Sequence, residues 1–141
     1  MSKIQIIEFS ILFIILNYLD IASKKLEELS EIKFLAEKNE DLKTMIITSL
    51  TEGNKVEDIN SKVSTGYDKI LKQINQNSNI QIIIKNKTNY DITDLLDELI
   101  QDHKDQSNLR KIETLEQKLI NNLDENSYLE LIKLKNQLNR E

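Results

Sequence analysis

Hydrophobic residues dominate the first part of the chain, from Ile4 to Ala22, and fall on nearly every side of a helix drawn through them. A helix that is apolar all round is typical of the centre of a bundle, where other helices surround it. Glu8, Asn17 and Asp20 interrupt the stretch. A membrane span needs about 20 predominantly apolar residues, and the longest unbroken apolar run here is Ile11 to Leu16. We therefore interpret the stretch as a buried first helix, with a membrane anchor or targeting segment as the alternative.

Amphipathic helices are predicted behind this stretch, because apolar residues recur there at the three- and four-residue spacing of one helix face. The predicted helices cover residues 24–37, 39–51, 56–64 and 67–74. In the third of them, Val56, Ile59 and Val63 are expected to face inward. Gly53 lies in the turn before it, since glycine accepts the left-handed conformation that ends helices. The apolar run 80–84 is too short for its periodicity to distinguish a short buried helix from an extended tether.

The longest helical pattern begins at Asp91, whose carboxylate is expected to cap the helix by accepting hydrogen bonds from first-turn amides. Apolar positions recur from Ile92 to Ile100, thin out in the polar stretch 103–108, and return from Leu109 to Ile120. The thinning indicates a helix that leaves one core and enters another. We therefore divide the chain into a helical bundle, residues 1–104, and a C-terminal helical hairpin, residues 105–141.

The hairpin is expected to turn at residues 121–124, with Asp124 as the cap of the last helix and Leu123 paired with Tyr128 in a hydrophobic staple. A hairpin of this size buries little surface, so some of its apolar side chains are expected to remain available for a partner. The expected fold class is therefore all-α: a helical bundle, a long helix and a C-terminal helical hairpin.

The composition narrows the function further. The 141 residues include no proline or cysteine and only two glycines. Without cysteine, disulfides and thiolate metal sites are excluded. The net charge is −5 and no basic stripe is visible. Proteins that grip phosphate backbones need such a stripe, so direct nucleic-acid binding is not expected.

The sequence offers few residues from which a catalytic site could be built. His103 is the only histidine and lies in a polar stretch, so we expect it to be a solvated surface residue. No zinc site or Ser-His-Asp triad can be assembled from one histidine. We therefore expect no catalytic residue, no metal, no cofactor and no small-molecule ligand. The four tyrosines are expected to pack at the edge of the core: Tyr18, Tyr67, Tyr90 and Tyr128.

The end of the chain carries a more specific pattern. Residues 123–138 resemble the end of bacterial DnaG-type primases, where a terminal helix follows the run Leu-Ser-x-Glu-Glu-x-x-Glu-Leu-x-x-Leu-x-x-x-Leu. The residues that match this run in place are Leu123, Glu130, Leu131, Leu134 and Leu138. Asp124 stands where the family has its capping serine, and Asn126 and Ser127 replace its acidic pair. The earlier helices resemble the same domain more loosely, as well as the N-terminal domain of replicative helicases, which is similar in fold.

The resemblance implies a non-catalytic, cytoplasmic module. In that family the hairpin binds the N-terminal domain of the DnaB-type hexameric helicase and brings primase to the replication fork, while the catalytic domains precede this region. We expect the helicase-binding residues to come from Leu109, Ile112, Leu115, Leu119, Tyr128, Leu131, Ile132, Leu134 and Leu138. Two alternatives remain: the N-terminal scaffold domain of a replicative helicase, and a helical protein anchored in a membrane by residues 4–22.

Overall fold

The computed structural model describes residues 2–76, 78–121 and 125–138. Within these ranges the chain is helical and contains no strand, which confirms the predicted all-α class. The helices are α1 (Lys3–Asn17), α2 (Leu19–Ser23), α3 (Leu26–Glu31), α4 (Glu37–Thr51), α5 (Val56–Gly66), α6 (Asp68–Asn75), α7 (Ser78–Ile84), α8 (Asn89–Asn121) and α9 (Glu125–Leu138). Contacts divide the chain into two units, Met1–Gln101 and Asp102–Glu141, so α8 contributes to both.

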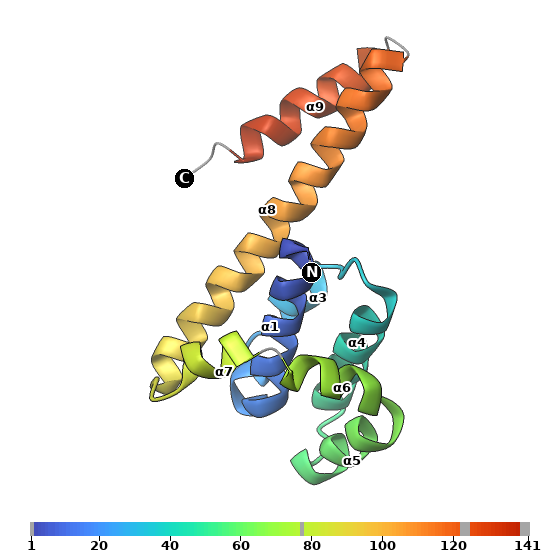
Figure 1. Cartoon of the computed structure of the whole chain (residues 1–141). Coiled ribbons are helices and arrows are strands. Elements are labelled where there is room, and N and C mark those ends of the chain that lie inside the picture. The colour runs from blue at the N-terminus through green and yellow to red at the C-terminus, as the bar shows by residue number, and fades with distance from the viewer. Residues whose placement is uncertain (1, 77, 122–124, 139–141) are drawn as a thin grey trace. The chain divides into compact units, whose positions relative to one another are not determined.

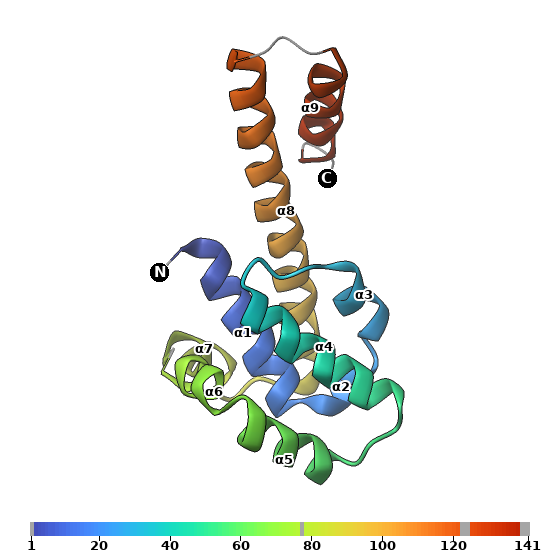
Figure 2. The ribbon, with the colours of Figure 1, turned by 90° about the vertical axis from the view of Figure 1, so that its right-hand side faces the viewer.

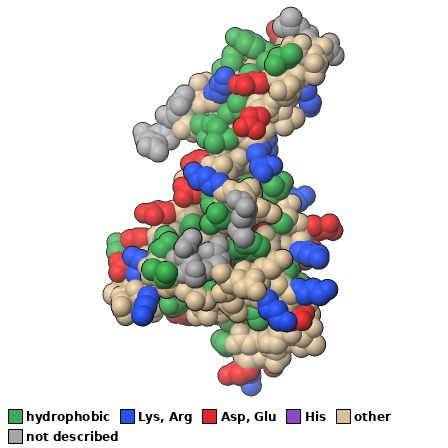
Figure 3. Space-filling model, viewed as in Figure 1, with side chains coloured by type: hydrophobic (Ala, Val, Ile, Leu, Met, Phe, Trp, Pro, Cys, Tyr) green, Lys and Arg blue, Asp and Glu red, His purple; other side chains and the backbone are tan. Residues whose placement is uncertain are grey.

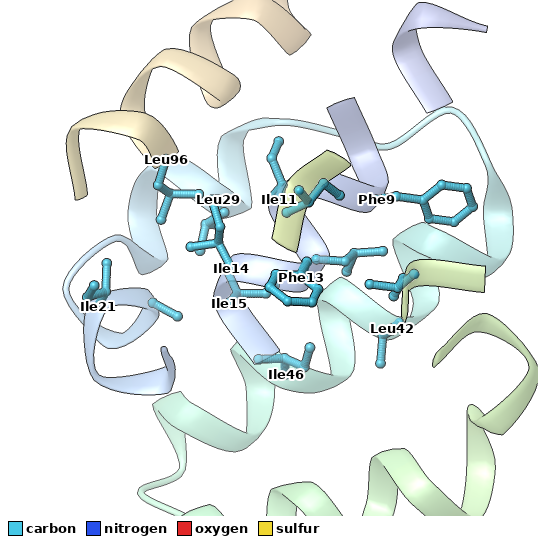
Figure 4. Packing of buried hydrophobic residues seen from close by; sticks show 14 of the residues in the cluster. Phe9, Ile11, Phe13, Ile14, Ile15, Ile21, Leu29, Leu42, Ile46 and Leu96 are labelled. Carbon is cyan, nitrogen blue, oxygen red and sulfur yellow. The ribbon is translucent and has the colours of Figure 1, made fainter. Parts of the chain in front are cut away.

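Helix α1 is the centre of the first unit, and α2, α4 and α6 pack against it (Figures 1 and 2). Four of its hydrophobic side chains, Ile11, Leu12, Ile14 and Ile15, have no exposed surface. Side chains from α1 meet Leu29, Leu42, Ile46 and Leu96 of other elements in the core (Figure 4). The prediction of a buried first helix is confirmed. Among the described residues, none of the helices has both the length and the apolar character that a membrane crossing requires.

The predicted helix over residues 24–37 is wrong in its second half. Helix α3 ends at Glu31, and Ile32 has an extended backbone with φ −91° and ψ 139°. Ile32 and Phe34 are buried, whereas Leu35 is 54% exposed. Extended backbone places alternate side chains on the same face, so this connection delivers both Ile32 and Phe34 to the core.

One further prediction is corrected in the same unit, and one open alternative is decided. Val56 is 51% exposed, although Ile59 and Val63 are buried as expected. Val56 is the first residue of α5, and helical side chains tilt toward the N-terminus, so it extends past the packed turns. The run 80–84 belongs to a short helix, α7, that buries Ile80 and Ile84, four residues apart.

The start of α8 differs from the prediction by three residues. The hydroxyl of Thr88 accepts a hydrogen bond from the backbone N–H of Asp91, at 3.2 Å. The carboxylate of Asp91 in turn accepts one from the backbone N–H of Thr88, at 3.4 Å. Asp91 is therefore the reciprocal partner in a capping box and not the capping residue itself.

A buried carboxylate holds the connection between α3 and α4. Glu8 of α1 has no exposed surface. It accepts hydrogen bonds from the backbone N–H groups of Leu35 and Ala36, at 2.5 and 3.3 Å, and from the side-chain amide of Asn39, at 3.1 Å. Ala36 is the N-cap of α4 and its side chain makes no cap hydrogen bond. Glu8 therefore supplies, from another helix, the acceptor that this helix end lacks.

A buried lysine serves the other side of the same connection. Lys43 of α4 is 2% exposed. Its ammonium group donates to the carbonyl oxygens of Leu29, at 3.0 Å, and Ile32, and forms an ion pair of 2.8 Å with Glu40. These carbonyls belong to the end of α3, where the helix leaves them without internal partners. Lys43 therefore stabilises the C-terminus of α3.

Candidate docking surface on the helical hairpin

The second unit is a helical hairpin made by the C-terminal part of α8 and by α9, which run side by side (Figures 1 and 2). Its core consists of Ile112, Leu115, Leu131 and Leu134, with the partly buried Leu119 and Leu138 packed against it. These six residues are all in the set predicted to bind the helicase. The four buried side chains join the two helices of the hairpin and do not form its exposed surface.

The other three predicted binding residues are on the surface. Leu109 is 41% exposed, Tyr128 53% and Ile132 38%. Two further apolar side chains are exposed that the predicted set does not contain: Ile120, at 75%, and Leu129, at 56%. The sequence could have indicated that these two residues are exposed, because each lies outside the core stripe of its helix. A hairpin with one core leaves such residues uncovered. The structure does not describe Leu123 and Asp124, so the predicted staple and cap lie outside the described residues.

The exposed apolar residues in the hairpin part of α8 share one face of that helix. Leu109 and Ile120 are eleven residues apart. Because successive residues of an α-helix are rotated by about 100°, this separation returns to nearly the same direction after three turns. Glu113 and Glu116 lie between them at spacings of four and three residues and share this face.

The exposed apolar residues of α9 also form one face. Ile132 is four residues after Tyr128 and three after Leu129, so the three side chains are neighbours on the helix surface. Lys135 follows Ile132 by three residues and joins the same face.

An ion pair shows that these two faces lie on the same side of the hairpin. The ammonium group of Lys135 is 3.1 Å from a carboxylate oxygen of Glu116. Each partner belongs to the exposed apolar face of its own helix. We call this surface the apolar side of the hairpin; it carries Leu109, Ile120, Tyr128, Leu129 and Ile132 around the ion pair. In the space-filling view, hydrophobic side chains with acidic and basic ones between them are visible on the hairpin (Figure 3).

The opposite side of the hairpin is polar. Lys111 directly precedes the core residue Ile112, whereas Glu113 directly follows it. A rotation of about 100° per residue therefore places Lys111 and Glu113 on opposite sides of the core seam. Lys104 and Lys118 lie seven residues to either side of Lys111 and share its face. We call this surface the lysine side.

The prediction that His103 is a solvated surface residue is wrong. This residue is 1% exposed and is therefore not a solvated surface residue. The reason is its place on α8: it follows Ile100 by three residues and Leu96 by seven, so it continues the buried face of the helix. The buried stripe thus extends into the polar stretch, where the sequence alone indicated that it had ended.

The prediction that the four tyrosines pack at the edge of the core is confirmed for two of them and wrong for the other two. Tyr18 and Tyr67 pack at the edge of the core, as predicted. Tyr90 and Tyr128 are 75% and 53% exposed, so the prediction of core-edge packing is wrong for both. Each lies in the first turn or two of its helix, outside the stripe that packs. No group of three or more histidine, cysteine or acidic residues suited to a metal occurs among the residues that the structure covers.

Comparison with known proteins adds no relative, since no family model, no curated protein and no solved structure matches this chain. The feature of the hairpin that suggests a function is thus its apolar side. Large exposed hydrophobic residues that cluster on one side of a small unit are typical of protein–protein contact surfaces.

Proposed function

We propose that this chain is a non-catalytic docking module of a bacterial replicative primase, and that its hairpin binds the N-terminal domain of a DnaB-type hexameric helicase. The observation that carries the proposal is the apolar side of the hairpin, with Leu109, Ile120, Tyr128, Leu129 and Ile132 exposed together. Burying such residues against a partner removes apolar surface from water, which drives association.

The resemblance of the last helix to primases supports the choice of partner. Of the positions that match the primase pattern, Leu131 and Leu134 are buried in the hairpin core and Leu138 packs against it. Three of the matched positions therefore build the hairpin and the matched Glu130 is exposed, while a second stripe, Tyr128, Leu129 and Ile132, stays on the surface. A helical hairpin of this kind can lay an apolar face into the groove of another helical domain.

We expect a few of the exposed residues to contribute most of the binding energy. A few large side chains usually carry most of the affinity, and tyrosine is among the residue types most often found there. Tyr128 and Ile132 are four residues apart and both exposed, so one partner pocket can contact both. We therefore expect these two residues to be the centre of the contact.

The test is a calorimetric titration of the intact chain into the N-terminal domain of the replicative helicase from the same organism. The unchanged chain is expected to bind with a Kd of about 1 μM or lower. A double variant, Tyr128→Ala with Ile132→Ala, should weaken binding by about thirtyfold or more, as loss of interface centres does.

A matched control comes from the first unit. Ile82 is 71% exposed but lies on α7, outside the hairpin, so Ile82→Ala should bind as the unchanged chain does. A folded chain that does not bind the helicase domain at all would refute the proposal. A chain that assembles by itself into a stable ring would instead favour the helicase scaffold domain.

A further inference from the structure

The apolar side of the hairpin also has a consistent charge. On α8, Asp102, Asp105, Glu113 and Glu116 follow the same face as Leu109 and Ile120, at spacings of three or four residues throughout. On α9, Glu125 precedes Tyr128 by three residues and Ile132 by seven, so it joins their face. Glu113 and Glu116 therefore lie between the exposed hydrophobic residues of α8, and three further carboxylates, Asp102, Asp105 and Glu125, precede those residues along the two helices.

Positive charge is largely placed elsewhere. Lys135 is the one lysine that we assign to the apolar side among the described residues, and it is paired with Glu116. Lys104, Lys111 and Lys118 are on the lysine side. Arg110 is two residues before Ile112, as Leu129 is two residues before Leu131, so both lie at the back edge of the apolar side. Five carboxylates still outnumber Lys135 and Arg110 on this side. The apolar side is therefore acidic.

We propose that the partner surface that binds the apolar side is a basic amphipathic one: hydrophobic residues of a helix or helix pair, flanked by Lys or Arg side chains. This inference rests on the proposed docking function and adds the chemistry of the partner. Complementary charge around an apolar contact steers encounter and fixes orientation. Glu113, four residues after Leu109 and seven before Ile120 on the same face, is in position to meet such a basic residue.

The same charge distribution disfavours two other occupants. In a symmetric dimer of this chain, the same patch meets itself, which would bring the carboxylates of two apolar sides together. A lipid surface attracts amphipathic helices that carry Lys and Arg beside their apolar face, and the carboxylates here have the opposite charge. A basic amphipathic protein surface can cover the apolar residues and also pair with the carboxylates.

The experiment compares two charge-reversal substitutions, one on the apolar side of the hairpin and one on the lysine side. Glu113 lies on the apolar side, three residues after Arg110; Glu130 directly precedes the core residue Leu131 and lies on the lysine side, three residues before Lys133. Both are exposed, in helix interiors and near one base. Glu113→Lys and Glu130→Lys therefore change the net charge of the chain equally and in similar surroundings.

Binding of each variant to the helicase N-terminal domain is measured by calorimetry in low and in high salt, after far-UV circular dichroism has checked its fold. Glu113→Lys should weaken binding by about five- to tenfold in low salt, and the difference should shrink in high salt because ions screen exposed charges. Glu130→Lys should bind within about twofold of the unchanged chain, as surface charges outside a contact contribute little.

The outcomes separate the two proposals. If the unchanged chain binds, the Tyr128→Ala and Ile132→Ala double variant does not, and Glu113→Lys binds as tightly as before, docking stands and the basic partner is refuted. Tighter binding by Glu113→Lys would likewise overturn it, since it would indicate an acidic partner surface. If the unchanged chain does not bind, the docking function itself fails, and the inference that rests on it fails too.

Discussion

The carboxylate of Glu8 in α1 accepts a hydrogen bond of 2.5 Å from the backbone N–H of Leu35, just before α4 begins. This contact joins the central helix of the first unit to a connection that has no regular structure of its own. The connection carries Ile32 and Phe34 into the core. Its conformation therefore depends on polar groups that are themselves buried, and these groups are expected to be important for stability.

Glu8→Ala should lower the free energy of unfolding by about 3 kcal/mol, because it leaves buried backbone N–H groups without their acceptor. Urea unfolding followed by circular dichroism measures the loss. Glu27→Ala is the control, since Glu27 is exposed in the first turn of α3 and should change stability by less than about 1 kcal/mol. Equal stability of the two variants would contradict the role of Glu8 as a remote cap.

Lys43→Met should lower the free energy of unfolding by about 2–3 kcal/mol. Methionine fills much of the volume of the lysine side chain but cannot donate to the carbonyls of Leu29 and Ile32, and buried acceptors without a donor are costly. Differential scanning calorimetry should show a lower Tm. The comparison is Lys38→Met, an exposed position in the same helix, whose Tm should stay close to that of the unchanged chain.

Lys25 and Asp97 make the stability of the first unit depend on pH at the alkaline end. The ammonium group of Lys25 is 3.0 Å from a carboxylate oxygen of Asp97. Their hydrogen bond is the main cause that raises the pKa of Lys25 above its ordinary value of 10.5. A raised pKa in the folded state stabilises the fold below the unfolded pKa, and this contribution is lost as pH rises through the folded one.

Lys25→Met should therefore be slightly less stable than the unchanged chain at pH 7, by less than about 1 kcal/mol because the pair is partly exposed. The difference should shrink once the pH passes well above 10.5. Urea unfolding of both proteins at pH 7 and at about pH 11.5 measures the two differences. A difference that grows at high pH would have the wrong sign for this ion pair.

The sequence predicted the helices well where periodicity reports a buried face. The apolar run from Ile11 to Leu16 marks the central helix, and the spacing of Leu42 and Ile46 marks α4. It did not predict the connection between α3 and α4, because Ile32 and Phe34 also fit a helical pattern. What makes this segment extended is contact with Glu8 and Lys43, and such long-range contacts are absent from any local pattern.

The sequence predicted that the hairpin carries the candidate site. It did not predict which apolar residues of the hairpin are buried in its core and which are exposed. Helix α9 has two apolar stripes, one through Leu131 and Leu134 and another through Tyr128 and Ile132. Local sequence does not decide which stripe meets α8, since both are hydrophobic. His103 illustrates the converse: its polar neighbours indicated a surface position, but its place on the face of Leu96 and Ile100 buries it.

The two stripes of α9 give a test in which the same substitution has different effects on fold and binding. Leu131 is buried in the hairpin core, whereas Leu129, two residues away, is 56% exposed. Leu131→Ala should destabilise the hairpin by about 2–4 kcal/mol, as buried leucine truncations do, and speed hydrogen exchange at amides of α9. Leu129→Ala should leave that exchange unchanged but weaken helicase binding by about fivefold or more, since it removes apolar contact area from the apolar side. If Leu129→Ala accelerates exchange as Leu131→Ala does, Leu129 belongs to the core and the assignment of the two stripes is wrong. If Leu129→Ala alters neither exchange nor affinity, the partner does not contact this end of the apolar side.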